Sequence, residues 1–226
     1  LVHMTSQFDH VSATDLHPDL ILMWQKVKND TFQPPKIMSE TQFKIIKQYK
    51  SPDATKAFVG FGCSFGGKFF GGYAQKYTNG KNEDFLKEAT NSIKKIMPKI
   101  QNVDFQCTDY QLLKPKNMII YCDPPYVSGK HPVKYRTSTK KYIEFDSTAF
   151  WNTVREWSKD NIVFVSEKQA PADFISIWEK KKQRSISQSK KTRFKNSETD
   201  KFSLEKLFVH RDTKKKFDYL FLRNYF

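Results

Sequence analysis

The apolar residues of this chain alternate between helical and strand spacing, in an order typical of an α/β fold. Helical spacing predicts helices within residues 15–31, 39–50, 82–97 and 146–157. Strand spacing predicts strands at residues 103–107, 118–122, 161–166, 205–210 and 219–222. Residues 5–14 read as irregular, and residues 174–178 as a short helix-to-strand segment. The order strand, loop, helix, strand over residues 118–166 predicts a right-handed crossover between two parallel strands.

The strand at residues 118–122 runs directly into Asp123-Pro124-Pro125-Tyr126. Neither proline can donate a hydrogen bond to a strand ladder, so the strand must end there. The sequence therefore presents a carboxylate, a rigid kink and an aromatic ring at the carboxyl end of a strand, where open α/β sheets bind their ligands. The alternative is a plain Pro-Pro turn in which Asp123 is only a cap.

The preceding strand has a similar ending, because residues 103–107 are followed by Thr108-Asp109-Tyr110. Since a short segment joins the two strands, we expect their carboxyl ends to be neighbours on one rim of a sheet. An ordinary turn residue is the alternative for Asp109.

Six of the eight glycines lie within residues 60–72, interleaved with aromatic residues. Residues 58–62 could form a glycine turn that receives a nucleotide-like cofactor. No second strand and acidic residue follow at the required interval. We therefore favour a packed glycine- and aromatic-rich block over residues 58–80, beneath the active face.

The composition limits the number of domains, the class of partner and the cellular compartment that we expect for the protein. With 226 residues the chain can form one domain with a sizeable core, which we place at residues 13–226. A net charge of +15 favours a polyanionic partner, nucleic acid before an anionic membrane surface, although lysines on solvated helix faces are an alternative. No apolar run approaches the about 20 residues of a membrane helix. The three cysteines lack metal-ligand spacing, so we expect reduced thiols, an intracellular protein and no bound metal.

Basic residues gather in two segments that are candidates for contact with DNA phosphates. The first is the loop over residues 127–145, which is long enough to act as a lid. The second, residues 180–195, holds eight Lys or Arg and no acid. A solvated loop is the alternative for both. The candidate residues are Lys134, Arg136, Lys140, Lys141, Arg184, Lys190, Lys191 and Arg193.

The Asp123-Pro124 pair suits the chemistry of an exocyclic amine on a nucleobase. Such an amine is a poor nucleophile, because its lone pair is delocalised into the ring. The Asp123 carboxylate and the proline-fixed carbonyl of Pro124 could accept both N–H groups and free that lone pair. Tyr126 could stack on the base, which must leave the duplex to be reached. Methyl transfer from a sulfonium donor then needs alignment rather than a strong base.

Taken together, these segments resemble the Dam-type (D12 class) DNA adenine N6-methyltransferases, including their short phage and viral members. Residues 121–126 match the catalytic motif of the family, and residues 105–110 and 162–166 resemble the strands on either side of it. The likeness covers about residues 13–211, with residues 58–73 similar to the glycine–aromatic block and residues 184–187, 191–193 and 205–208 similar to the C-terminal hairpin. It implies a Rossmann-like S-adenosylmethionine-dependent methyltransferase sheet with a C-terminal antiparallel hairpin.

The resemblance also implies roles for single residues. Asp123, Pro124 and Pro125 would hold the target amine, and Tyr126 would stack on the base. Asp15 matches an acid that binds the ribose hydroxyls of S-adenosylmethionine, while a helix cap is its alternative role. Asp109 and Tyr110 would flank the adenine of the cofactor, which Asp123 also borders. The implied substrate is double-stranded DNA, inside a cell, in a viral or restriction–modification setting.

One difference from the family bears on activity. Before the position of Asp15, family members carry a lysine-containing glycine segment and a first strand that cradle the cofactor, and this sequence shows neither. We expect a fragment, a second protein chain that supplies this part, or a loss of activity, and we favour the second chain. The open edge of the sheet would then need a partner.

Several functions therefore stay open. The leading one is transfer of a methyl group from S-adenosylmethionine to the N6 amine of adenine in DNA, by this chain alone or as one subunit of a split enzyme. The others are a non-catalytic DNA-binding or partner subunit, and a cytosine N4 or RNA methyltransferase.

Overall fold

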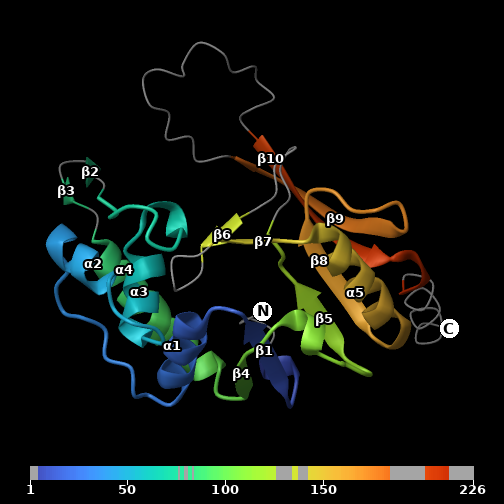
Figure 1. Ribbon diagram of the computed structural model, residues 1–226, viewed down its shortest axis with the longest axis horizontal. Coiled ribbons are helices and arrows are strands. Elements are labelled where there is room, and N and C mark those ends of the chain that lie inside the picture. Colours follow the sequence, from blue (N-terminus) through green and yellow to red (C-terminus); the bar gives the residue numbers. More distant parts are fainter. Residues whose placement is uncertain are drawn as a thin grey trace, which may run out of the picture. The chain divides into compact units, whose positions relative to one another are not determined.

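The computed structural model describes residues 5–75, 77–78, 81–82, 84–125, 134–136, 142–183 and 202–213. The chain divides into two compact units, whose elements are labelled in Figure 1. Unit 1 comprises Leu1–Leu112 and Tyr135–Ile143, and unit 2 comprises Leu113–Lys134 and Glu144–Phe226. Both parallel and antiparallel strand pairs occur, so the predicted mixed α/β class is confirmed at that level.

Unit 1 surrounds a parallel pair of strands with helices. Its elements are η1 (Thr5–Gln7), β1 (Val11–Asp15), α1 (Pro18–Lys28), α2 (Glu40–Ile46), α3 (Ala54–Gly62), η2 (Phe65–Gly67), β2 (Tyr77–Thr78), β3 (Lys81–Asn82), α4 (Phe85–Ile96), η3 (Met97–Lys99), β4 (Val103–Cys107) and η4 (Tyr110–Leu112). Strand β1 pairs with β4 in parallel, with Val11 opposite Val103 and Asp15 opposite Cys107.

Side-chain caps explain where the helices of unit 1 begin. Ser39 accepts from the N–H of Gln42, whose own side chain accepts from the Ser39 N–H, so α2 starts with a complete capping box. Asp53 caps α3 and Asp84 caps α4 in the same way. The predicted helices α1, α2 and α4 are thereby confirmed.

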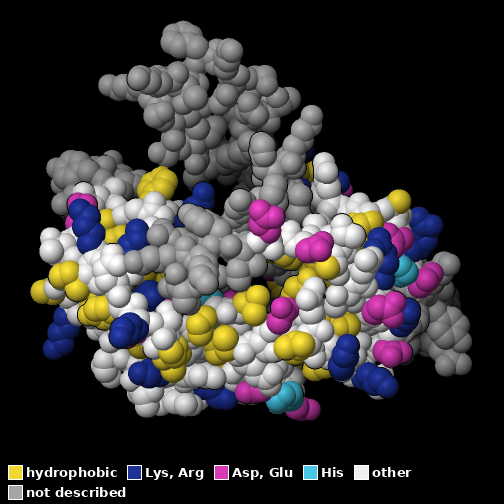
Figure 2. Space-filling model, viewed as in Figure 1, with side chains coloured by type: hydrophobic (Ala, Val, Ile, Leu, Met, Phe, Trp, Pro, Cys, Tyr) yellow, Lys and Arg dark blue, Asp and Glu magenta, His cyan; other side chains and the backbone are white. Residues whose placement is uncertain are grey.

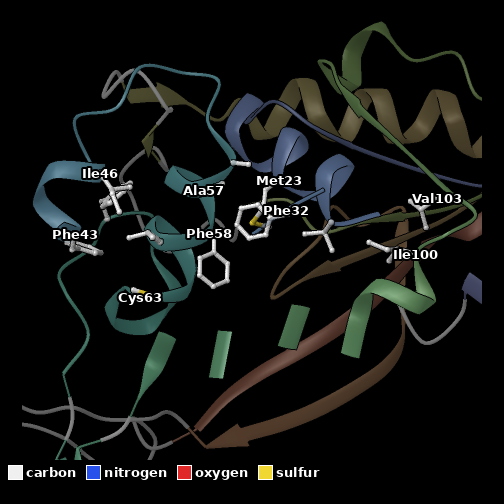
Figure 3. Close-up of a cluster of buried hydrophobic side chains, with 13 residues drawn as sticks. Met23, Phe32, Phe43, Ile46, Ala57, Phe58, Cys63, Ile100 and Val103 are labelled. Atoms are coloured by element: carbon white, nitrogen blue, oxygen red, sulfur yellow. The ribbon is translucent and has the colours of Figure 1, made fainter. Parts of the chain in front are cut away.

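The core of unit 1 is a cluster of side chains from α1, α2, α3 and the start of β4, shown in Figure 3. Phe58 and Phe32 pack with ring centroids 5.4 Å apart, and Phe43 and Phe70 with centroids 5.0 Å apart. The other buried members are Met23, Val27, Ile46, Ala54, Ala57, Val59, Cys63, Ile100 and Val103.

Unit 2 is a four-stranded sheet with a helix across it. Its elements are β5 (Ile119–Cys122), α5 (Ser147–Asp160), β8 (Ile162–Glu167), β9 (Phe174–Gln183) and β10 (Phe202–His210). Strands β6 (Lys134–Arg136) and β7 (Tyr142–Glu144), most of whose residues belong to unit 1, form a separate two-stranded sheet. The strand order is β5-β8-β10-β9, in which β5 and β8 are parallel and the other neighbours antiparallel. The predicted parallel pair of residues 118–122 and 161–166 is therefore confirmed.

Helix α5 covers one face of this sheet (Figure 1). Its buried Trp151 and Val154 belong to the same core as the buried Val163 and Val165 of β8. The Trp151 ring lies 4.6 Å from the ring of Phe174 on β9. Alternate residues of β8 are buried, as expected for a strand with one face against a helix.

Three sequence predictions need correction. Residues 11–15 form strand β1 rather than irregular chain. Their mostly polar sequence does not predict a strand, and the backbone hydrogen bonds to β4 are what stabilise it. Residues 54–62 form helix α3, so Gly60 and Gly62 are helical, with Asp53 as the cap. Residues 174–183 form one continuous strand, β9. Strand β4 belongs to unit 1 and β5 to unit 2, so the predicted proximity of the carboxyl ends of residues 103–107 and 118–122 stays a prediction.

Membrane-spanning helices are not found in the described ranges, where every helix is too short or too polar to cross a bilayer.

Candidate active site

The carboxyl end of β5 presents Asp123 to solvent on a fixed backbone. Residues 119–122 lie in register with residues 162–165 of β8, and the Met118 carbonyl accepts from the Ile162 N–H over 3.0 Å. The chain then leaves the sheet at Asp123, which is exposed, while the next residue, Pro124, is buried. Within the described part of the chain, Asp123 forms no ion pair with a basic side chain.

A second carboxylate influences Asp123 from β10. Residues Ser166 of β8 and Leu207 of β10 are directly opposite each other, which places Glu205 of β10 near the end of the sheet from which Asp123 emerges. Partial desolvation and, secondly, the charge of Glu205 raise the pKa of the Asp123 carboxyl. A carboxylate with a raised pKa is the more basic acceptor of a hydrogen bond.

Tyr121 belongs to the same end of the sheet. Its side chain is 48% exposed, and its hydroxyl hydrogen-bonds the side chain of Ser166. Desolvation raises the pKa of this phenol, with smaller contributions from Asp123 and Glu205. Successive side chains of a strand alternate, so Cys122 is directed to the opposite face of the sheet from Tyr121. Burial raises the pKa of the Cys122 thiol to about 12. The Tyr121 phenol and the carboxylates of Asp123 and Glu205 thus influence one another electrostatically at this end of the sheet.

Unit 1 has its own polar strand end, where β1 and β4 finish together. The Thr108 N–H donates to the Asp15 carbonyl over 3.2 Å, which brings Asp109 next to the end of β1. Asp15 is exposed, and its Oδ1 accepts from the His17 N–H over 2.7 Å. The cap of α1 is His17 rather than Asp15, so the alternative role of Asp15 as the helix cap is not the one that this structure shows.

Asp109 and Tyr110 form the turn that follows β4. Asp109 Oδ1 accepts from the Gln111 N–H over 3.0 Å, and the Asp109 carbonyl accepts from the Leu112 N–H over 3.0 Å. Tyr110 opens the short helix η4 and is half-buried. Asp109 therefore has a structural role in this turn, at a strand end that it shares with Asp15.

Several predicted site residues lie outside the described residues or are described only as backbone. Tyr126, Lys140, Lys141, Arg184, Lys190, Lys191 and Arg193 lie outside the described residues, and Lys134 and Arg136 are described only as backbone of β6. Figure 2 shows the basic side chains of the visible face scattered among acidic and hydrophobic ones. The roles of these basic residues stay predictions.

Two residues of interest were not found from the sequence. Glu205 was assigned only to a strand, and its place near Asp123 follows from the β8–β10 register, which one sequence does not reveal. His17 was noted only as part of a helix start, although a polar residue before Pro18 is a recognisable capping signal. Across the described ranges, no three His, Cys, Asp or Glu side chains gather in a way that could hold a metal ion.

Comparison with known protein families places most of the matched segment on unit 2 and the end of unit 1. A model described as D12 class N6 adenine-specific DNA methyltransferase matches residues 66–193, more than half of the chain. The matched range includes Asp109, Tyr110 and the Asp123-Pro124-Pro125-Tyr126 segment, and it excludes Asp15 and Glu205. Comparison with curated proteins gave no match.

Proposed function

The chain belongs to the D12 class N6 adenine-specific DNA methyltransferases, and from that membership we propose that it methylates the N6 amine of adenine in DNA. The methyl donor is S-adenosylmethionine, whose sulfonium supplies an activated methyl group. The observation that carries the proposal is the position of Asp123, exposed at the end of a parallel strand and followed by the buried Pro124.

Asp123 and Pro124 would act on the amine together. The carboxylate accepts from one N–H of the amine, and the Pro124 carbonyl, held by two successive prolines, accepts from the other. Both hydrogen bonds draw the nitrogen towards tetrahedral geometry and return its lone pair to the nitrogen. The lone pair would form the N–CH3 bond as the S–CH3 bond of the donor breaks and S-adenosylhomocysteine leaves. The methylated amine would then lose one proton, and Asp123, which accepts from one of its N–H groups, is the candidate base. The raised pKa of Asp123 favours that transfer.

Asp15 fits the ribose of the cofactor. Its carboxylate is exposed at a strand end, and His17 occupies one oxygen while the second faces no described donor. Vicinal hydroxyls are donors that suit such an oxygen. Asp109 and Tyr110 follow the adjoining strand end and would border the adenine of the cofactor.

The test is a methylation assay on plasmid DNA, with detection of N6-methyladenine by mass spectrometry of the released nucleosides. Replacing Asp123 with Ala should lower kcat by about 10²–10³-fold, as the loss of a preorganised hydrogen-bonding group does elsewhere. Asp104→Ala is the matched control, because Asp104 is an exposed carboxylate on a strand, engaged only with Gln106 among the described residues. Equal rates for wild type and Asp123→Ala would refute the proposed role.

The basic residues of the segment 180–195, predicted from the sequence, are proposed to hold the duplex. We expect the triple change of Lys190, Lys191 and Arg193 to Ala to flatten the dependence of DNA affinity on salt, by about 0.9 in logarithmic slope for each phosphate that these side chains neutralise. Binding would be measured by fluorescence anisotropy across a salt series. An unchanged slope would show that these residues do not bind the phosphates.

The edge of β5 that pairs with no other described strand of unit 2 supports a second chain as part of the enzyme. Among the described strands β5 pairs with β8 alone, and its residues Met118, Ile119 and Tyr121 are 41%, 53% and 48% exposed. Soluble proteins rarely leave such an apolar edge unpaired. We propose that a second polypeptide contributes an extended strand here together with further cofactor contacts. Full activity of a purified monomer, established by light scattering and assay on one sample, would rule this out.

A further inference from the structure

The acid proposed to bind the cofactor is held by a histidine that has no part in the reaction described above. The His17 N–H donates to Asp15 Oδ1 over 2.7 Å. The imidazole of His17 is also the cap of helix α1, because its Nδ1 accepts from the Leu20 N–H over 3.3 Å. One residue therefore fixes the carboxylate through its backbone and the helix through its ring.

The ring of His17 lies against two aromatic rings of the glycine- and aromatic-rich block. Its centroid is 4.4 Å from that of Phe69 and 5.5 Å from that of Phe61, both in edge-to-face geometry. The Nε2 atom is shielded from solvent and has no hydrogen-bond partner within the described ranges. Burial lowers the pKa of His17, although the charges of Asp19 and Asp15 oppose the change. A neutral ring that accepts at Nδ1 carries its proton on Nε2.

Phe69 has little room to move away from His17. The Phe70 N–H donates to the Gly60 carbonyl over 2.8 Å, which draws the chain after Phe69 against helix α3. A Cβ built on Gly60 would lie 2.5 Å from Cε2 of Phe69, so only glycine admits this approach. The contacts thus run without a gap from Gly60 through Phe69 and His17 to Asp15.

We propose that His17 is a positioning residue for the methyl donor, because Phe61 and Phe69 fix its ring and thereby the backbone N–H that orients the Asp15 carboxylate. This rests on the proposed function, since the ligand that benefits is the cofactor of that reaction. The glycine- and aromatic-rich block would then have a function in cofactor binding, because its rings fix His17 and thereby the orientation of Asp15.

A double-mutant cycle on Asp15 and His17 tests this role. The ligand is S-adenosylhomocysteine, whose ribose matches that of the methyl donor, and its Kd is measured by titration calorimetry. His17→Asn keeps a side-chain acceptor for the cap of α1 and removes the ring. We expect His17→Asn to weaken binding about tenfold, a coupling of ordinary size for neighbouring residues. In an Asp15→Ala background the same change should have no further effect, because no carboxylate remains to be oriented.

Two glycines of the same helix provide a remote test. Gly60→Ala places a Cβ 2.5 Å from Phe69, so the ring that packs on His17 must shift, whereas the new Cβ of Gly62→Ala meets the Cβ of Ala89 at 2.8 Å and neither His17 nor Phe69. We expect Gly60→Ala to weaken binding of S-adenosylhomocysteine and Gly62→Ala to leave the Kd unchanged. Similar melting temperatures for the two variants would show that the weaker binding does not come from unfolding.

The outcomes separate this inference from the proposed function. If Asp15→Ala binds S-adenosylhomocysteine as tightly as wild type, the cofactor role of Asp15 is wrong, and His17 has nothing to position. If Asp15→Ala weakens binding but His17→Asn does not, or if His17→Asn weakens it equally in both backgrounds, only the inference fails. A readout without ligand is the carboxyl carbon resonance of Asp15. His17→Asn should shift this resonance, and an unmoved resonance overturns the inference by itself.

Discussion

At the scale of single residues, the pair of carboxylates at the end of β5 sets how the reaction should respond to pH. Only the ionised form of Asp123 accepts the hydrogen bond and the proton of the amine. Desolvation and the charge of Glu205 raise the pKa of Asp123, so the rate should fall as the pH drops through that raised value. Glu205→Gln removes the neighbouring charge, which lowers the pKa of Asp123 and moves the acidic limb of the kcat profile to lower pH.

Glu179→Gln is the control for that experiment. Glu179 also lies in the β9–β10 ribbon, where it pairs with Lys206 over 2.8 Å, and it does not affect the pKa of Asp123. Its replacement should leave the acidic limb in place. The coupling between Asp123 and Glu205 would be contradicted if the acidic limb of the kcat–pH profile did not move in Glu205→Gln, or if it moved equally in Glu179→Gln.

The second prediction for single residues concerns the stability that a buried ion pair contributes. Asp19 and Lys56 are 0% and 3% exposed, and Asp19 also accepts from the Asp53 N–H and the Ser51 hydroxyl. Replacing Asp19 with Ala leaves the Lys56 ammonium buried beside fewer acceptors, which should lower the free energy of unfolding by about 3–5 kcal/mol. Urea denaturation measures this loss. Adding Lys56→Met should restore part of it, and a double variant no more stable than Asp19→Ala would show that the buried charge was not the cause.

At the scale of elements, the capping residues decide how helix α5 begins. Asp146 accepts from the Ala149 N–H over 2.9 Å, and its charge lies at the positive end of the helix dipole. Asp146→Ala should therefore lower the free energy of unfolding by about 1 kcal/mol. Asp160, the last residue of α5, is an exposed acid at the unfavourable end, so Asp160→Ala should be neutral or slightly stabilising. Equal destabilisation by the two changes, in urea titrations, would contradict the argument.

The elements that sequence reasoning could predict are those with a local signal. The capping residues Ser39 and Gln42 predict the start of α2, and Asp146 predicts the start of α5. The alternation of residues 162–167 predicts strand β8. Strand β1 carries no such signal, because Val11 to Asp15 are mostly polar and become a strand through pairing with β4. Helix α3 was obscured by Gly60 and Gly62, whose low helix propensity is outweighed by the buried contacts of Phe58 and Val59.

The candidate site likewise has one part that the sequence predicts and one part that it does not. The carboxyl end of β5 could be predicted because apolar residues, an acid and two prolines are consecutive there. The neighbours of that site could not, since Glu205 comes close to Asp123 only through the register of β10 against β8. Sequence separation hides such contacts, and strand register is a property of the folded sheet.

At the scale of the whole molecule, the last prediction concerns the edge of β5. Since the Met118 carbonyl bonds to β8, the alternation of a parallel ladder turns the N–H groups of Ile119 and Tyr121 away from β8. In the isolated chain these two amides should exchange with deuterium quickly, while those of Ile120 and Cys122 are protected by pairing. A second polypeptide that adds a strand to this edge should protect Ile119 and Tyr121 selectively and lower the Kd for S-adenosylhomocysteine in the same titration. Slow exchange of both amides in the chain alone would mean that the edge is already covered, and the active enzyme would then need no second chain at this place.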